Sequence, residues 1–226
     1  MGVVGGPDAN TDQLDFYIDP ANPNSYTSGS STAVNMVGNY NGTISGATFL
    51  TSSVSQGVWN LDNDDSIRFD SVQDLGISSS IEMWVKRNDV SGTEFWIGGE
   101  GTGFPTSYQY IFATVNTTDF YVRFGAAWKL YANSIWNSTT EWRHVVLSRD
   151  GVNSGKLYVN GNEIAVTGTS STWGGNTLVR SIGVGADLGN NPSYANIQLG
   201  PVLFYKKTLS PAEVLDNYNL SKWRFV

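Results

Sequence analysis

The clearest local signal in this chain is the stretch Lys156-Leu157-Tyr158-Val159-Asn160-Gly161-Asn162-Glu163-Ile164. Two runs rich in β-branched and aromatic residues flank an Asn-Gly pair. That pair favours a two-residue turn in which both central residues have positive φ. The stretch therefore predicts a tight β-hairpin.

Similar short runs, in which apolar and polar residues alternate, recur on both sides of this hairpin. They are separated by turn residues, and they include Leu14–Ile18, Thr43–Leu50, Ser66–Phe69, Ile81–Lys86, Tyr108–Val115, Asp119–Phe124, Trp142–Ser148, Ile182–Ala186 and Ile197–Tyr205. About a dozen strands at such short intervals are typical of an antiparallel sandwich or barrel. The pattern predicts an all-β fold.

One helix is expected near the end of the chain. The run Ser210-Pro211-Ala212-Glu213 has the features of a capping box, with proline at the first helical position. Val214, Leu215 and Tyr218 would then share one face, which predicts a short helix lying against a sheet. We expect residues 1–13 to form a loose arm and residues 14–226 to form a single domain.

Composition excludes several classes of function. Thirteen Lys and Arg against 20 Asp and Glu give a net charge of −7, and no basic run offers a footprint for a phosphate backbone, so we expect no nucleic-acid partner. The absence of cysteine excludes disulfides, cysteine-ligated zinc and thiol catalysis. No apolar stretch reaches the length of a membrane span, and the first residues lack the features of a signal peptide.

Several segments resemble the laminin-G-like, concanavalin A-like lectin/glucanase family of jelly-roll domains. They run in the family's order along nearly the whole chain: Leu14–Asp19, Asn22–Tyr26, Asp62–Ile67, Ile81–Lys86, Trp142–Val146, Arg149–Gly151, Leu157–Gly161, Ile182–Gly185 and Phe204–Val214. The resemblance implies a two-sheet antiparallel β-sandwich, of the concanavalin A-like jelly-roll type, with one short C-terminal helix.

The last segment, Asn217–Phe225, resembles the ending of such domains in structural proteins of tailed bacteriophages, although Trp223 stands where those proteins have a small residue. This resemblance implies a non-enzymatic virion protein, on the capsid surface as a decoration protein or in a tail fibre. Its partners would be other virion proteins and further copies of itself, and it would be made in the host cytoplasm. The alternative is a carbohydrate-binding lectin module that binds cell-surface glycans, with or without calcium.

Catalytic residues are sparse. Glucanases on this fold use two carboxylates about 5–10 Å apart, whereas the comparable strand here carries Glu82 alone, with Trp84 and Lys86 at the next alternate positions. Glu82 is expected to be a partly exposed strand residue. The single histidine, His144, is expected on the strand face opposite to the core. We therefore expect no enzymatic activity.

The densest group of oxygen ligands is formed by Asp62, Asp64 and Asp65. Calcium prefers six to eight oxygen ligands, so these carboxylates are the candidate calcium ligands. The alternative is a tight turn in which the Asp side chains accept backbone N–H groups. No other cofactor is expected.

Aromatic residues near strand ends and loops have three interpretations: buried packing, a partner interface or a sugar-binding surface. The candidates for carbohydrate or partner binding are Trp96, Tyr108, Tyr110, Trp128, Tyr131, Trp136 and Trp173. Most of them fall between residues 92 and 140, where we expect any ligand to bind.

Overall fold

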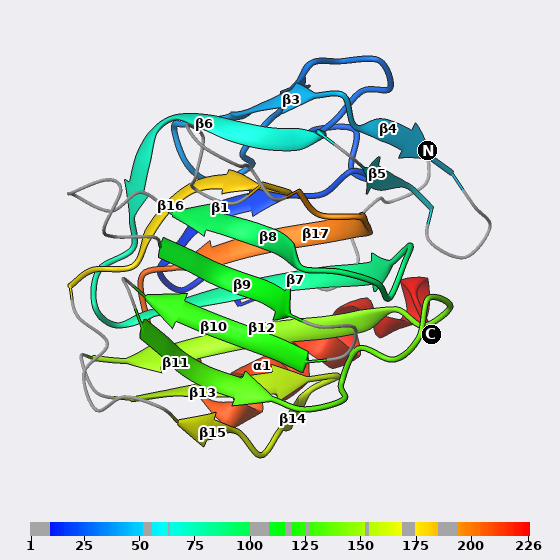
Figure 1. Ribbon diagram of the computed structural model, residues 1–226. Helices are drawn as coiled ribbons and strands as arrows, with labels where there is room; N and C mark the ends of the chain where they lie inside the picture. Colours follow the sequence, from blue (N-terminus) through cyan, green and yellow to red (C-terminus); the bar gives the residue numbers. More distant parts are fainter. Residues whose placement is uncertain are drawn as a thin grey trace.

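The computed structural model describes residues 10–51, 56–62, 64–99, 109–115, 119–124, 127–151, 154–168, 175–184 and 194–226. Within these residues, two antiparallel sheets pack face to face and a single α-helix lies near the C-terminus (Figure 1). The predicted fold class is confirmed.

The two sheets have eight and nine strands. The eight-stranded sheet has the order β14 (Asn162–Glu163), β13 (Ser154–Val159), β12 (Arg143–Asp150), β7 (Ser79–Arg87), β17 (Ile197–Tyr205), β5 (Val58–Leu61) and β4 (Thr48–Leu50), with β1 (Leu14–Ile18) also paired to β17. The nine-stranded sheet has the order β15 (Thr167–Gly168), β11 (Ala127–Ala132), β10 (Asp119–Phe124), β9 (Gln109–Val115), β8 (Glu94–Gly99), β16 (Leu178–Ile182), β6 (Ser66–Asp74), β3 (Gly42–Ser45) and β2 (Thr32–Ala33).

The hairpin predicted from Asn160-Gly161 joins β13 to β14. Asn160 has φ 51° and Gly161 has φ 79°. Val159 pairs with Asn162 across the turn. This is the two-residue turn with positive φ at both central positions, as predicted.

The central strands of the eight-stranded sheet are buried on both faces. In β7, Ile81, Met83 and Val85 point into the main core between the sheets. The alternate residues Glu82 and Trp84 are equally buried, at 2% and 1% exposure. A second layer must therefore cover the outer face of this sheet.

That layer consists of α1 (Pro211–Ser221), the short 3-10 helix η1 (Lys222–Arg224) and the segment before them. Helix α1 begins with the predicted capping box: Ser210 and Glu213 cap each other's backbone N–H groups. Val214 is buried against the sheet, whereas Leu215 is 43% exposed, so its predicted place on the packed face is wrong. Asn217, three residues after Val214, is the buried polar residue on that face.

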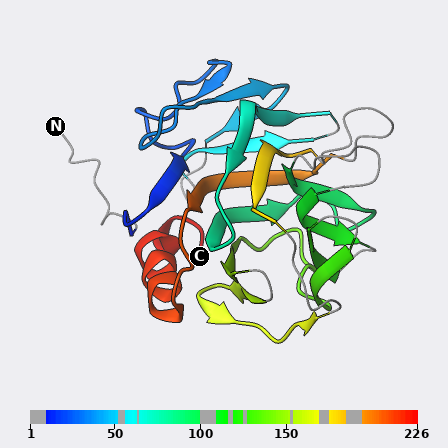
Figure 2. The same cartoon turned by 90° about the vertical axis from the view of Figure 1, so that its left-hand side faces the viewer.

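Helix α1 and strands β8 to β11 lie on opposite sides of the sandwich (Figure 2). The described part of the N-terminal segment lies beside the helix, because the Asn10 backbone N–H donates to Asn217 Oδ1 at 3.1 Å. Asp12 forms an ion pair with Lys207 at 2.8 Å. No helix in the described ranges is long and apolar enough to cross a bilayer.

Candidate functional site

Two of the aromatic candidates belong to the core. Trp96 and Trp136 are 0% and 1% exposed, and their rings meet edge to face with centroids 4.6 Å apart. Both pack against Phe120 between the sheets. Their proposed place on a sugar or partner surface is therefore wrong, because both rings are buried in the main core between the sheets.

The indole of Trp96 is held by a buried ion pair. Its Nε1 donates to Glu94 Oε2 at 2.9 Å, while Arg87 Nη2 lies 2.7 Å from Glu94 Oε1. Burial raises the pKa of the Glu94 carboxyl, and the Arg87 charge opposes that shift. Glu94 is thus a structural link between β7 and β8.

The remaining aromatic candidates divide between described and undescribed positions. Tyr108 and Trp173 lie outside the described residues. Tyr110 and Trp128 belong to β9 and β11, but their side chains are also outside the described part. Tyr131 in β11 is described, and it lies between the buried residues Leu130 and Ala132. Since side chains alternate along a strand, Tyr131 faces outward.

Tyr131 stacks on a second outward-facing tyrosine, Tyr121 of β10. The two residues are direct cross-strand partners, with ring centroids 5.6 Å apart and an interplanar angle of 16°. Tyr121 lies between Phe120 and Val122, which are both fully buried. Sequence reasoning missed Tyr121, although the alternation of β10 carries the signal: with Phe120 and Val122 inward, Tyr121 must point outward.

The stacked pair continues into a row across neighbouring strands. Tyr131 is paired with the exposed Thr167 of β15. Adjacent strands are about 4.8 Å apart, so Tyr121, Tyr131 and Thr167 span about 10 Å. We call these three residues the tyrosine row; Figure 1 shows its strands β10, β11 and β15 side by side.

The surroundings of Tyr121 affect the protonation of its hydroxyl. Partial burial raises the pKa of the Tyr121 hydroxyl, and the charge of Asp119 on the same strand adds to this shift. The phenol therefore stays protonated at neutral pH and remains a hydrogen-bond donor. The row offers a flat apolar surface with hydroxyl groups at its margins.

The aspartate cluster forms a turn. Asp65 Oδ2 accepts from the Asp62 backbone N–H at 3.0 Å, and the Asp65 N–H donates to the Asp62 carbonyl at 2.9 Å. Burial raises the pKa of Asp65. These contacts fit the turn interpretation, and no group of three His, Cys, Asp or Glu residues with metal-binding geometry occurs among the described residues. Calcium binding by Asp62, Asp64 and Asp65 stays a prediction.

The two titratable residues of β7 and β12 that sequence reasoning considered for catalysis are buried together. His144 Nε2 lies 2.9 Å from Glu82 Oε1, and Asn217 of helix α1 donates to Glu82 Oε2 at 2.7 Å. His144 does lie on the face opposite to the core, as predicted. The expectation of a partly exposed Glu82 is wrong, because α1 covers that face.

Comparison with known proteins identifies the family to which this fold belongs. The profile of the laminin-G type within the concanavalin A-like lectin/glucanases superfamily matches residues 61–215, which is more than half of the chain. The chain belongs to the concanavalin A-like lectin/glucanase superfamily. None of the curated proteins matches its sequence.

Solved structures with a similar fold include part of a sialidase. A mutant Trypanosoma rangeli sialidase displaying trans-sialidase activity is 14% identical with a TM-score of 0.67, over 95% of this chain and 34% of the sialidase. The chain thus spans about a third of that enzyme's length.

Two further solved domains are similar as well. Domain 4 of AbnA, an extracellular arabinanase from Geobacillus stearothermophilus solved with arabinotriose, is 18% identical with a TM-score of 0.64, over 91% of this chain and 98% of the domain. The binding domain of botulinum neurotoxin serotype D is 14% identical with a TM-score of 0.66, over 92% of this chain and 52% of the other. At these identities the likeness concerns the fold.

Proposed function

We propose that this member of the concanavalin A-like superfamily is a non-catalytic carbohydrate-binding module, and that the tyrosine row is its binding surface. The observation that carries the proposal is the outward-facing stack of Tyr121 on Tyr131. A pyranose or furanose ring has an apolar C–H face that packs on a flat aromatic ring, and its hydroxyl groups need hydrogen-bonding partners at the ring's margin. Tyrosine supplies both in one side chain.

The dimensions of the row support an oligosaccharide rather than a single sugar. Its span of about 10 Å across three strands is comparable with two consecutive sugar rings. The stacked rings of Tyr121 and Tyr131 lie within that span. A neutral oligosaccharide is the first ligand to test, because the arabinanase domain with a similar fold was solved with arabinotriose.

The absence of catalysis is part of the proposal. Glu82 and Glu94 are both buried, and each is engaged by a basic side chain. Neither carboxylate reaches the outward face on which the tyrosine row lies. A hydrolase would need an accessible carboxylate pair, so incubation with neutral polysaccharides should release no sugar.

The binding test compares four proteins on neutral oligosaccharides, arabinotriose included, by glycan array and calorimetry. Tyr121→Ala and Tyr131→Ala should each weaken binding about three- to tenfold. Trp223→Ala is the matched control, since Trp223 is 55% exposed and belongs to η1 beside α1, on the other face of the sandwich. Unchanged affinity in both tyrosine variants, or no binding by the wild type, would refute the proposal.

A second proposal concerns location: the module is displayed on a virus particle beside other virion proteins and copies of itself. It rests on the resemblance of Asn217–Phe225 to the ending of such domains in phage structural proteins. Quantitative mass spectrometry of particles from the source gives the copy number. Hundreds of copies indicate a capsid position and a few dozen a tail fibre, whereas absence from particles overturns this proposal.

A further inference from the structure

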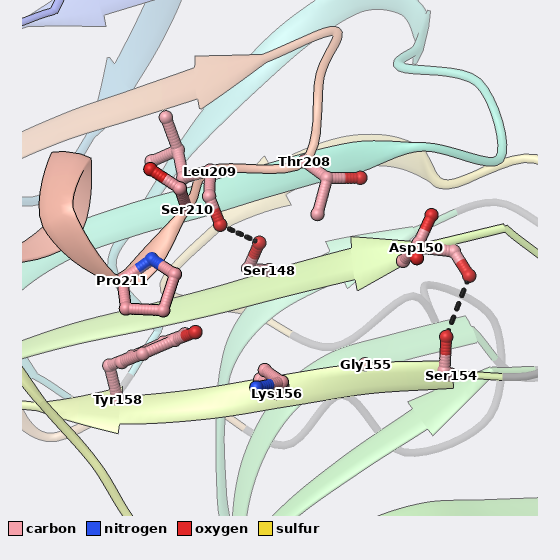
Figure 3. A pocket seen from close by; sticks show the side chains of 10 residues that line it. All are labelled: Ser148, Asp150, Ser154, Gly155, Lys156, Tyr158, Thr208, Leu209, Ser210 and Pro211. Atoms are coloured by element: carbon pink, nitrogen blue, oxygen red, sulfur yellow. Dashed lines mark hydrogen bonds between the residues drawn. The ribbon is translucent and has the colours of Figure 1, made fainter.

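A pocket of about 290 Å³ opens on the other face of the sandwich from the tyrosine row, between β12, β13 and the chain that leads into α1. Figure 3 shows Ser148, Lys156 and Tyr158 along one side and Thr208 to Pro211 along the other. Ser148 pairs with Lys156, and Val146 pairs with Tyr158, so these side chains share the outer face of the sheet. The volume lies at the lower end of the range for small-molecule sites, which suits one ring-sized ligand.

The hydroxyl groups of the pocket are oriented as acceptors. Ser148 donates to the Leu209 carbonyl at 2.7 Å, Ser154 to the Asp150 carbonyl at 2.8 Å, and Thr208 to the Arg149 carbonyl at 2.7 Å (Figure 3 marks the first two). A hydroxyl has one proton and two lone pairs, so the hydroxyls of Ser154 and Thr208, which already donate, keep lone pairs for a ligand. The Ser148 hydroxyl also accepts from Ser80 at 3.3 Å and is 2% exposed, so it serves the wall of the pocket. The pocket therefore suits a ligand rich in O–H donors.

Tyr158 adds the one uncommitted hydroxyl. Its residue exposure is 1%, its ring packs with Val146, Leu209 and Val214, and its hydroxyl has no hydrogen-bond partner among the described groups. In Figure 3 this hydroxyl points into the space between Pro211, Ser148 and Lys156. Buried tyrosine hydroxyls normally have a hydrogen-bond partner. A ligand hydroxyl in the pocket would supply that partner for Tyr158.

Charge argues for a neutral ligand. The Lys156 ammonium is paired with Glu163 at 2.8 Å. The start of α1 is already capped by the Glu213 carboxylate, whose pKa is lowered to about 2 by its bonds with Lys207 and Ser210. The N-terminus of a helix normally attracts an anion. At the start of α1, however, the Glu213 carboxylate would repel an anion.

We propose that this pocket binds a single neutral sugar ring, either free or as a terminal residue of a glycan. The acceptor hydroxyls of Ser154 and Thr208 receive ligand O–H groups, and Tyr158 exchanges a hydrogen bond with a further ligand hydroxyl. Leu209 and Pro211 supply the apolar walls for the C–H face. This site does not depend on the tyrosine row, and each of the two can fail without the other.

The test is a titration of the isotope-labelled full chain with neutral monosaccharides at millimolar concentrations, followed by amide NMR. At least one sugar should shift the amides of Gly155, Lys156 and Leu209, and Tyr158→Phe should weaken its binding about three- to tenfold. Tyr158→Phe removes a hydroxyl without a protein partner, so the variant should fold normally. Tyr121→Phe, the same deletion on the opposite face, should leave this binding unchanged.

Three results would overturn the proposal. The first is that no neutral sugar shifts these amides. The second is that Tyr158→Phe and Ser154→Ala both bind as tightly as the wild type. The third is that inorganic phosphate or sulfate shifts the same amides more strongly than any sugar, because recognition would then depend on charge.

Discussion

The replacement Asn217→Ala should release helix α1 from the sheet beneath it. Asn217 is 2% exposed, and its amide donates to Glu82 Oε2 at 2.7 Å and to the Tyr205 hydroxyl at 3.0 Å. Its Oδ1 accepts from the Asn10 backbone N–H at 3.1 Å. One side chain therefore connects the sheet, the helix and the N-terminal segment.

The expected loss in the free energy of unfolding follows from the hydrogen bonds that Asn217→Ala removes. A hydrogen bond to a buried carboxylate contributes about 1.5–3 kcal/mol, and each bond between neutral groups contributes about 0.5–1.5 kcal/mol. The free energy of unfolding should therefore fall by about 2.5–6 kcal/mol. The largest single part of this loss arises at Glu82, whose carboxylate stays buried with His144 Nε2 as its other partner.

Denaturant unfolding followed by tryptophan fluorescence measures this loss. Trp84 is a suitable reporter, because its ring lies 5.3 Å from the His144 ring. The midpoint should fall with little change in slope, as expected for a stability change without a change in exposed surface. Asn219→Ala is the control on the same helix: Asn219 is exposed and bonds only to Lys222 in the described structure, so the loss should be below about 0.5 kcal/mol. A loss below about 1 kcal/mol for Asn217→Ala would refute this account of the helix attachment.

Two further predictions concern charged residues. Arg224→Met should lower the free energy of unfolding, measured with denaturant, by about 3–5 kcal/mol. The variant leaves the Asp19 carboxylate buried without the two hydrogen bonds that it accepts from the Arg224 guanidinium at 2.7 and 3.0 Å. A loss under about 1 kcal/mol would contradict this. The bonds of Glu213 with Lys207 and Ser210 lower its pKa from 4.5 to about 2, so its contribution to stability is complete above about pH 4.5 and is lost as the pH falls towards 2. Glu213→Gln should remove this part of the acid dependence. An unchanged dependence of the unfolding free energy on pH would show that the bonds of Glu213 with Lys207 and Ser210 do not stabilise the fold.

The local features of the fold could be predicted because short segments determine them. The Asn160-Gly161 turn and the Ser210–Glu213 capping box each depend on the residues within a few positions, and the structure confirms both. The alternation in β12 also placed His144 on the correct face. Each of these predictions uses only the period of the element and the chemistry of its ends.

Burial on the outer face could not be predicted in the same way. Glu82 is covered by Asn217, which is 135 positions away in the chain, and nothing near Glu82 indicates this contact. Trp96 and Trp136 lie next to loops in the sequence yet meet each other in the core. The outward direction of Tyr121, by contrast, could have been predicted from the sequence. Its neighbours Phe120 and Val122 are apolar, and side chains alternate along a strand.

Helix α1 links the stability of the chain to the proposed sugar pocket. Ser210 and Pro211, at the start of the helix, form part of the pocket wall, and the Asn217 contact holds the same helix two turns later. If Asn217→Ala loosens the helix, the pocket should bind a sugar less tightly, because part of the binding free energy is then used to restore the wall. The tyrosine row lies on the other sheet and should bind its oligosaccharide as before. Equal weakening at both sites would instead mean that the variant disturbs the whole sandwich, and unchanged binding in the pocket would mean that its wall does not depend on the helix.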